Sequence, residues 1–297
     1  MSGVALWVTG ARLRTLPAAV VPVAVGAACA VALDDGQRSP VGVVWWRVAL
    51  ALLVSLALQV GVNYANDYSD GVRGTDDDRV GPLRLVGSGA ASAQAVRNAA
   101  FAALAIAAVA GATLALATSL WLIAVGVLAI ASAWGYTGGP RPYGYSGLGE
   151  VFVFVFFGLV ATVGTTYVAV ESVDFRSVIA GCGVGALACA LLVVNNLRDI
   201  PTDTVAGKNT LAVRLGDAGT RRLYEALIAM ALVAVVLVAR DRPWALIALV
   251  SLLAVVSPLR TVRGGATGSA LISVLGNTGR AQAIYGALLT VGLVLPG

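Results

Sequence analysis

Apolar positions run along this chain in long stretches that are separated by short polar segments. A helix of about 17 or more apolar residues is long enough to cross the ~30 Å hydrocarbon layer of a bilayer. Such stretches are predicted at about 15–33, 44–66, 95–117, 119–136, 148–170, 178–197, 222–239, 243–259 and 277–296. The pattern therefore predicts an all-α, polytopic membrane bundle of about nine transmembrane helices. The short connection near Ser119 allows the third and fourth stretches to be divided differently.

The N-terminal stretch has some features of a signal peptide. It contains Pro17 and Pro22, is longer than a usual signal core, and is followed by many more apolar stretches. We interpret it as the first transmembrane helix.

Composition agrees with a membrane protein and narrows the chemistry. The chain is 59% hydrophobic and only 12% charged, whereas soluble domains carry about 25% charged residues. Residues 1–297 are therefore expected to form one transmembrane domain whose partners include the lipid bilayer and no nucleic acid. The chain has no histidine, which excludes histidine bases and histidine metal sites. A metal would have to be a hard cation on oxygen ligands.

The basic residues fall mostly on one side of the predicted bundle. Fifteen of the 20 Lys and Arg residues belong to the N-terminus and to the loops after the second, fourth, sixth and eighth stretches. Because positive loops remain in the cytoplasm, the N-terminus and these loops are predicted to be cytoplasmic, in a bacterial plasma (inner) membrane. Nine spans then place the C-terminus outside.

The first acidic patch reads "NYANDYSDGVRGTDDDRVGPLR" and directly follows an apolar stretch. If the helix continues, Asn63, Asp67 and Asp70 share one face within about 60° and point into the bundle at its cytoplasmic end. A similar patch lies about 130 residues further on. The repetition suggests two related half-bundles, about 1–145 and 146–297, that meet at one site.

The second patch reads "NNLRDIPTDTVAGKNT". Asn196, Asp199 and Asp203 are predicted to share a face, with Asn195 at its edge. Pro201 disfavours helix at the preceding residue and removes a backbone donor. Asp203 is therefore expected to reach the site from a kinked or newly started turn.

Opposed carboxylates at the end of a bundle repel one another unless cations lie between them. Carboxylate and amide oxygens suit Mg²⁺, which binds through a few carboxylates and through substrate phosphates. Charged groups next to apolar helices are costly and usually functional. The predicted Mg²⁺ ligands are Asn63, Asp67, Asp70, Asn196, Asp199 and Asp203. The basic residues that could neutralise a bound diphosphate are Arg73, Arg79, Arg84, Arg141, Arg198 and Lys208, the last being the chain's only lysine.

A transporter of an organic anion would also place acids in two half-bundles. Carriers usually bind their substrates near the bilayer midplane, whereas these acids lie at the predicted cytoplasmic ends of the spans. The pattern favours an enzyme.

The two acidic patches resemble the motifs of the UbiA superfamily of intramembrane aromatic prenyltransferases. The first motif of that family reads NDxxDxxxD, and here it runs from Asn66 and Asp67 through Asp70 to Gly74, which replaces the final acid. Asp76, two residues further on, is a candidate substitute. The second motif matches at Asp199 and Asp203.

The strings "GPLR" and "YTGGPRPYGYSGLGE" resemble the branch of this superfamily that acts on 1,4-dihydroxy-2-naphthoate. The resemblance implies a nine-helix bundle with a central cavity and cytoplasmic cap loops. It also implies Mg²⁺-dependent transfer of a polyprenyl group from polyprenyl diphosphate, with loss of CO₂, in menaquinone synthesis. Other acceptors within the superfamily are 4-hydroxybenzoate, homogentisate and haem.

Together, the resemblance and the residue pattern assign roles at one site. The catalytic group comprises Asp67, Asp70, Asp199, Asp203 and Lys208. Substrate contacts are assigned to Asn63, Asn66, Arg73, Arg79, Arg84, Tyr136, Arg141, Tyr143, Asn195, Asn196 and Arg198.

The glycine- and proline-rich segment 135–150 is expected to form a loop over the cavity. Within it, Arg141 is a candidate partner for the acceptor's carboxylate, and Tyr136, Tyr143 or Tyr145 could stack on a ring or a cation. Glu150 is expected to be the buried partner of an arginine. "GCGVG" at 181–185 predicts close helix packing.

Overall fold

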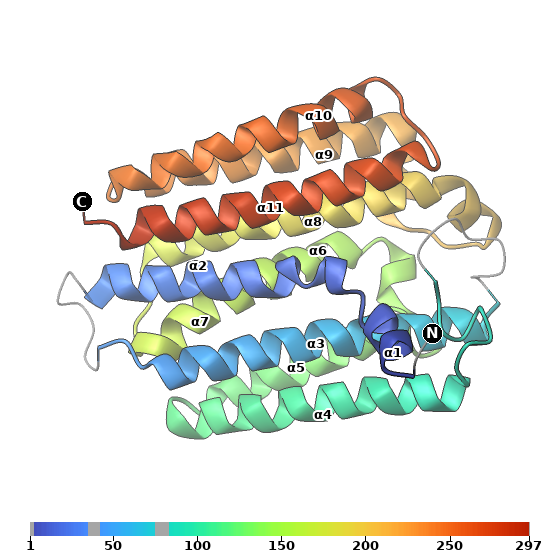
Figure 1. Ribbon diagram of the computed structural model, residues 1–297, viewed down its shortest axis with the longest axis horizontal. Helices are drawn as coiled ribbons and strands as arrows, with labels where there is room; N and C mark the ends of the chain where they lie inside the picture. The colour runs from blue at the N-terminus through green and yellow to red at the C-terminus, as the bar shows by residue number, and fades with distance from the viewer. Residues whose placement is uncertain (1–2, 35–41, 75–82, 297) are drawn as a thin grey trace.

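The computed structural model describes residues 3–34, 42–74 and 83–296, and this part of the chain is helical with no strand (Figure 1). Asp76 and Arg79 lie outside the described residues. Six of the described helices are long and apolar enough to cross a membrane by length and composition. Their ranges are Pro17–Asp34, Trp45–Val72, Ala93–Ala117, Gly149–Val170, Phe175–Val205 and Pro243–Arg263. The prediction of an all-α bundle with several membrane-crossing helices is confirmed.

Each of the nine predicted stretches coincides with a helix or with consecutive helical segments in the described part of the chain. The elements are α1 (Gly3–Ala11), η1 (Leu13–Thr15), α2 (Pro17–Asp34), α3 (Trp45–Val72), α4 (Ala93–Ala117), α5 (Trp121–Gly135), η2 (Tyr143–Ser146), α6 (Gly149–Val153), η3 (Phe154–Val160), α7 (Ala161–Val170), α8 (Phe175–Val205), α9 (Leu211–Val238), η4 (Pro243–Ser251), α10 (Leu252–Arg263) and α11 (Ala270–Val294). Both helices with acidic patches, α3 and α8, extend well beyond their apolar stretches.

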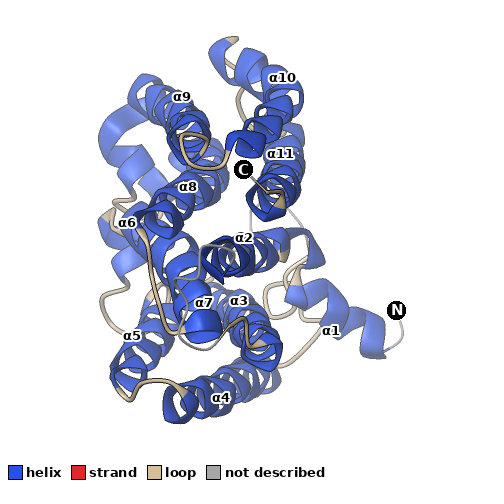
Figure 2. Ribbon diagram, turned by 90° about the vertical axis from the view of Figure 1, so that its left-hand side faces the viewer, coloured by secondary structure: helices blue, strands red, loops and turns tan. Residues whose placement is uncertain are grey.

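The long helices lie side by side, so the connections between them gather at the two ends of the bundle (Figure 1). Seen end-on, α2 lies between α11 and the pair formed by α3 and α7 (Figure 2). The C-terminal ends of α3 and α8 and the α5–α6 connection share one end, which we call the polar end (Figure 1). The helix α1 projects from the side of the bundle (Figure 2).

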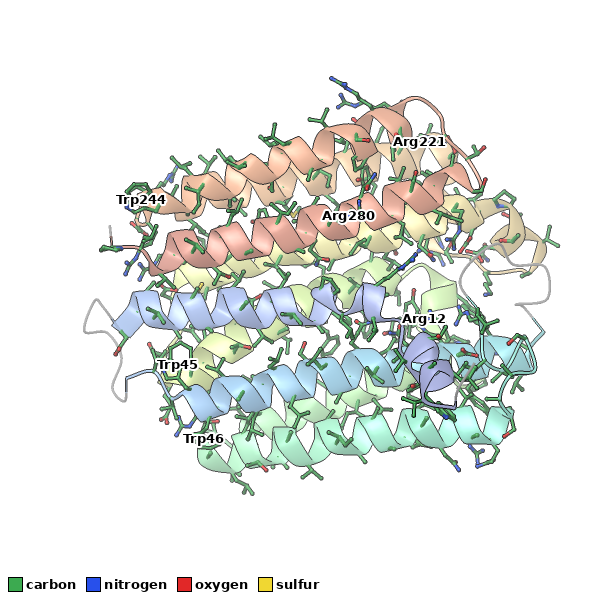
Figure 3. The ribbon with its side chains drawn as sticks, in the orientation of Figure 1. Arg12, Trp45, Trp46, Arg221, Trp244 and Arg280 are labelled. Atoms are coloured by element: carbon green, nitrogen blue, oxygen red, sulfur yellow. The ribbon has the colours of Figure 1, made fainter. Side chains whose placement is uncertain are left out.

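Tryptophans mark the opposite end. Trp45, Trp46 and Trp244 are exposed there (Figure 3), as expected of aromatic residues at a membrane–water interface. In the same region, the Arg47 guanidinium donates to the Glu171 carboxylate (2.6 Å) and to the Ala117 carbonyl (3.0 Å). This arginine therefore ties α3 to the ends of α4 and α7.

The helix α8 stays α-helical through Pro201 to Val205, so Asp203 does not begin a new turn, which was one of the two predicted alternatives. Proline removes one backbone donor, but the neighbouring turns of this helix remain α-helical. Asp199 and Asp203 consequently project from one continuous helix.

Glycines allow α8 to approach the segment η3, which is a π-helix, very closely. A Cβ atom on Gly158 would lie 2.6 Å from the Gly185 Cα atom and 2.8 Å from the Gly181 carbonyl oxygen. A Cβ atom on Gly185 would lie 2.9 Å from the Gly158 Cα atom. The prediction of close helix packing at 181–185 is confirmed.

We predict that Gly185→Ala lowers the free energy of unfolding in detergent by about 1–3 kcal/mol, because the added methyl group would overlap backbone atoms that cannot yield locally. Thermal unfolding of the purified protein measures this effect. Gly126→Ala is the matched control, since a Cβ atom on Gly126 in α5 would meet nothing within 4 Å. Equal unfolding temperatures for both variants would contradict the packing argument.

Candidate functional site

A large cavity opens between the polar ends of α3 and α8. Its volume is about 2840 Å³. The polar end of the cavity is lined by amides, carboxylates and cations, while its deeper part is lined by apolar side chains of α3, α4, α5, η3 and α7. Examples of these apolar residues are Val54, Leu58, Leu114, Ile123, Phe156 and Val168. A charged group therefore fits at one end of the cavity and a long apolar chain at the other.

Most of the predicted site residues line this cavity. They are Asn63, Asn66, Asp70, Arg84, Tyr136, Tyr143, Asn195, Asn196, Arg198, Asp199, Asp203 and Lys208. Asp67, Arg73 and Arg141 are not among the lining residues. Most of the residues predicted to form the site therefore line one cavity.

Asp70 is the point on α3 where several charges converge. The Tyr145 hydroxyl donates to Asp70 Oδ1 at 2.7 Å, and Lys208 Nζ lies 3.6 Å from the same oxygen. Arg84 Nη2 lies 3.4 Å from Asp70 Oδ2. Asp70 and Arg84 are buried, the Lys208 side chain is largely buried, and Tyr145 is half-buried. Two cations from distant parts of the chain thus neutralise one carboxylate.

Asp67 has a different environment from the one predicted. Its side chain is fully buried, Oδ2 accepts from the Leu85 amide at 2.8 Å, and Oδ1 accepts from the Val86 amide at 3.0 Å. Successive helix positions differ by about 100°, which turns Asp67 towards segment 84–88 while Asn66 and Asp70 face the cavity. This carboxylate anchors the polypeptide that carries Arg84, and the structure does not present it to the cavity.

Asn63 lines the cavity but is also bound to the N-terminal segment. Its amide nitrogen donates to the Ala11 carbonyl and to Thr15 Oγ1, both at 2.9 Å. Asn66 Oδ1 accepts a hydrogen bond from the Thr137 hydroxyl at 2.7 Å.

On α8, Asp199 is held by the neighbouring arginine. Arg198 donates through Nε to Asp199 Oδ1 and through Nη2 to Asp199 Oδ2, each at 2.7 Å, and Nη2 also donates to Asn195 Oδ1 at 2.9 Å. Two parallel bonds of this kind are strong and orient both groups.

The Asn196 amide instead donates to Glu150 Oε1 at 2.9 Å. The predicted arginine partner of Glu150 is therefore wrong, because the side chain that reaches it is an amide from α8.

The two helices present equivalent rows of cavity-lining positions spaced four residues apart. On α3 the row is Asn66 and Asp70, with Gly74 just beyond the end of the helix, and on α8 it is Asn195, Asp199 and Asp203. Residues four apart lie about 40° from each other on a helix, so each row forms a gently winding ridge. Of the predicted residues Asn63, Asp67 and Asp70, Asp70 belongs to the α3 ridge, Asn63 lines the cavity at another position, and Asp67 does not line the cavity.

The α5–α6 connection forms one wall of the cavity mouth. Arg73 donates to the carbonyl oxygens of Thr137 and Gly139, and the Asn209 amide donates to the Tyr145 carbonyl oxygen at 3.0 Å. Within this connection, Tyr136, Thr137, Tyr143, Gly144 and Tyr145 line the cavity. Arg73 fixes this loop and does not face the cavity.

Tyr145 lies beneath two cations. Lys208 Nζ is 4.5 Å and the Arg73 guanidinium carbon 5.4 Å from its ring centroid, within the range of cation–π attraction. Burial, reinforced by the negative charge of Asp70, raises the pKa of Tyr145 well above its ordinary value. Its hydroxyl therefore remains protonated at neutral pH and can donate to Asp70.

Arg141 is exposed and lies outside the cavity lining, which does not fit its predicted contact with a bound acceptor. The cavity instead includes three arginines that sequence reasoning did not select: Arg12, Arg14 and Arg280. The position of Arg12 and Arg14 directly before the first apolar stretch could have indicated them as site candidates. Arg280 could have been selected because it is the single charged residue of the predicted span 277–296.

The oxygen-rich lining fits a hard divalent cation. Within the described residues, no three acidic side chains come together as a closed metal site. The carboxylates of Asp70 and Asp199 already attract Lys208, Arg84 and Arg198. Mg²⁺ often binds through a few carboxylates together with substrate phosphate oxygens. The donor set of the two ridges suits that mode.

Comparisons with known proteins agree with this geometry. Residues 6–268 match the UbiA prenyltransferase family. The chain is 51% identical, over 100% of its length and 99% of the relative's, to a 1,4-dihydroxy-2-naphthoate octaprenyltransferase of Mycobacterium tuberculosis. It is 36% identical, over 78% of this chain and 75% of the relative, to the protein of that name from Escherichia coli (strain K12).

Solved structures share the fold. A UbiA homolog from Aeropyrum pernix K1 in its apo form aligns with a TM-score of 0.73 at 17% identity, covering 94% of this chain and 98% of that one. A UbiA homolog from Archaeoglobus fulgidus bound to GPP and Mg²⁺ aligns with a TM-score of 0.56 at 15% identity, covering 96% and 99%.

We predict that Asp67→Asn lowers the free energy of unfolding by about 1–3 kcal/mol, because an amide supplies one acceptor oxygen for two buried backbone donors. Asp203→Asn is the matched control at the half-buried cavity wall and should cost less. Thermal unfolding in detergent, without ligands, compares the two variants. A larger loss for Asp203→Asn would contradict the scaffold role of Asp67.

Proposed function

Since the chain belongs to the UbiA prenyltransferase family, we propose that it transfers a polyprenyl group from polyprenyl diphosphate to 1,4-dihydroxy-2-naphthoate, with loss of CO₂, giving demethylmenaquinol for menaquinone synthesis. The names of relatives up to 51% identical over the full chain support the acceptor. One structural observation carries the proposal. Two ridges of amides and carboxylates, paired with cations, lie at the mouth of an apolar cavity.

Mg²⁺ is the cofactor, and a structure of a family member bound to GPP and Mg²⁺ supports this. The ridges supply its ligands in this chain: Asn66, Asp70, Asn195, Asp199 and Asp203. Asn63, Asp67 and Asn196, which the sequence analysis also selected, serve to hold the N-terminal segment, segment 84–88 and Glu150 in place. When bound, Mg²⁺ neutralises the charge that develops on the departing diphosphate.

The cations near the ridges bind the phosphate oxygens. Lys208, Arg84 and Arg198 now contact carboxylates, and each is within side-chain reach of the space between the ridges. A compact ammonium on a flexible stem, such as Lys208, can follow the diphosphate as it leaves. The Tyr145 ring keeps this ammonium at the cavity mouth.

The reaction needs no strong protein base. The bond between prenyl C1 and the diphosphate oxygen breaks, and its electron pair leaves with the diphosphate. The electron-rich acceptor carbon that carries the carboxylate then bonds to prenyl C1. Loss of CO₂ returns an electron pair to the ring and restores its aromaticity, which is consistent with a chain that has no histidine.

The apolar compartment protects this chemistry from water. Its lining by α3, α4, α5, η3 and α7 gives the polyprenyl tail a surface that matches it, and burial of each CH₂ group contributes about 0.8 kcal/mol. Water is kept away from the allylic carbon, which would otherwise be hydrolysed.

The arrangement in the membrane forms part of the proposal. The nine helical stretches span a bacterial inner membrane, with the N-terminus and the polar end in the cytoplasm, as the distribution of Arg and Lys indicates. The two ridges belong to two related half-bundles, about 1–145 and 146–297.

Other acceptors of the superfamily, namely 4-hydroxybenzoate, homogentisate and haem, form the alternative. A panel assay separates them. The purified protein in liposomes is given labelled farnesyl diphosphate, each acceptor in turn, and either Mg²⁺ or EDTA. The proposal expects a decarboxylated product with 1,4-dihydroxy-2-naphthoate and Mg²⁺ only. Turnover of another acceptor alone would refute the assigned substrate, and no turnover of any prenyl diphosphate would favour an organic-anion carrier.

We predict that Asp199→Asn and Asp70→Asn each lower kcat/KM by about a hundredfold or more, because charge stabilisation of several kcal/mol is lost. The measurement is initial rate in the same liposome assay with saturating Mg²⁺. Asp217→Asn is the matched control, since Asp217 lies on the exposed face of α9 and pairs with Arg221. Near-normal activity in either ridge variant would contradict the assignment.

We also predict that the C-terminus lies outside the cytoplasm. A C-terminal alkaline phosphatase fusion should be active in cells, whereas a C-terminal green fluorescent protein fusion should remain dark. The reversed pattern would exclude an odd number of spans with a cytoplasmic N-terminus.

A further inference from the structure

Arg280 is the single charged residue of α11 (Ala270–Val294). It lines the cavity, and its position on α11 is visible in Figure 3. No described residue forms a hydrogen bond or an ion pair with it. Charged side chains within membrane-crossing helices are costly and usually belong to substrate sites. The function derived above assigns no role to this arginine.

The packing of α11 places Arg280 near the ridge of α8. The two helices run in opposite directions (Figure 1). A Cβ atom on Gly279 would lie 3.7 Å from Leu191 Cδ2, and Leu191 is one helical turn before Asn195. Side chains on a helix lean towards its N-terminus, which for α11 is the polar end (Figure 1). The Arg280 side chain is therefore directed towards the level of Asn195 and Asp199.

The surroundings of Arg280 differ from those of the other cations. Arg84, Arg198 and Lys208 already contact Asp70 or Asp199. The cavity lining beside Arg280 includes Ser273 and Asn277 of α11 and Ser269 just before this helix, together with apolar residues such as Ile272 and Leu275, and no acid. This wall is therefore mixed in polarity and carries a positive charge, and it lies across the cavity from the apolar compartment formed by α3, α4 and α5.

We propose that Arg280 binds the carboxylate of the aromatic acceptor and so positions the ring carbon that carries it; this assignment rests on the proposed function. A guanidinium binds a carboxylate through two parallel hydrogen bonds. The diphosphate lies between the ridges with its tail in the apolar compartment, and the acceptor lies on the α11 side. Both arginines are solvent-exposed, but only Arg280 lines the cavity, and it thereby takes the role predicted for Arg141.

The test compares two ligands that differ by one carboxylate. Binding of 1-hydroxy-2-naphthoate and of 1-naphthol to the purified protein is measured by tryptophan fluorescence, which does not require turnover. Arg280→Ala should weaken binding of 1-hydroxy-2-naphthoate by about 10- to 100-fold, the range for loss of a charge-assisted hydrogen bond, and leave 1-naphthol unchanged. Arg280→Lys should retain part of the preference, because it keeps the charge and loses the bidentate geometry.

Kinetics give a second measure in the liposome assay. Arg280→Ala should raise KM for 1,4-dihydroxy-2-naphthoate by a similar factor and leave KM for farnesyl diphosphate unchanged. Arg222→Ala, which removes an exposed arginine of α9 outside the cavity, is the matched control and should behave as the unmodified protein.

Several outcomes would overturn this assignment. Equal weakening of both ligands would indicate a steric or structural effect, and a raised KM for farnesyl diphosphate alone would place Arg280 at the diphosphate. Unchanged binding of 1-hydroxy-2-naphthoate would also refute it. If the unmodified protein does not prenylate 1,4-dihydroxy-2-naphthoate, the proposed function fails, while the fluorescence comparison still decides whether Arg280 recognises a carboxylate.

Discussion

The structure depends on the neutralisation of carboxylates where apolar helices end. Asp70 on α3 and Asp199 on α8 would repel each other and would be costly to bury. Asp70 is paired with Arg84 and Lys208, and Asp199 is paired with Arg198. These cations come from segments that follow α3 and from α8 and its turn, so charge pairing joins distant parts of the chain around one opening. In the proposed reaction, the carboxylates of these pairs bind the metal ion and the cations bind the diphosphate, so each pair exchanges its internal contact for a contact with a ligand.

The acidic residues near this opening divide into two groups. Asp70, Asp199 and Asp203 line the cavity, whereas Asp67 binds two backbone amides and holds the segment that carries Arg84. Among the amides, Asn66 and Asn195 lie on the ridges, whereas Asn63 and Asn196 line the cavity but also bind the N-terminal segment and Glu150. Residues such as Asp67 support the site indirectly, by holding a neighbouring segment in place. Their substitution should therefore lower the free energy of unfolding.

The cavity has walls of different chemistry. Apolar side chains of α3, α4, α5, η3 and α7 enclose the deep compartment, and α11 contributes a wall of mixed polarity that contains Arg280. Close packing of glycines between α8 and η3 holds the ridge of α8 against the bundle. In the proposed reaction this division separates the apolar donor tail from the anionic acceptor. The two substrates then meet only between the ridges.

The sequence by itself determined the helical class, the approximate helix positions and the end of the bundle at which most of the candidate site residues gather, because these follow from apolar stretches and from charges placed at their ends. It also identified most of the polar lining. It did not determine which of several residues on one helix face the cavity, because Asp67 and Asp70 differ by only about 60° in direction. The groups that bind Asp67 are the backbone amides of Leu85 and Val86, which are distant from it in sequence. The continuation of α8 through Pro201, the loop contacts of Arg73 and the place of Arg280 in the cavity were likewise decided only by tertiary packing. Each depends on a contact between segments that no local pattern connects.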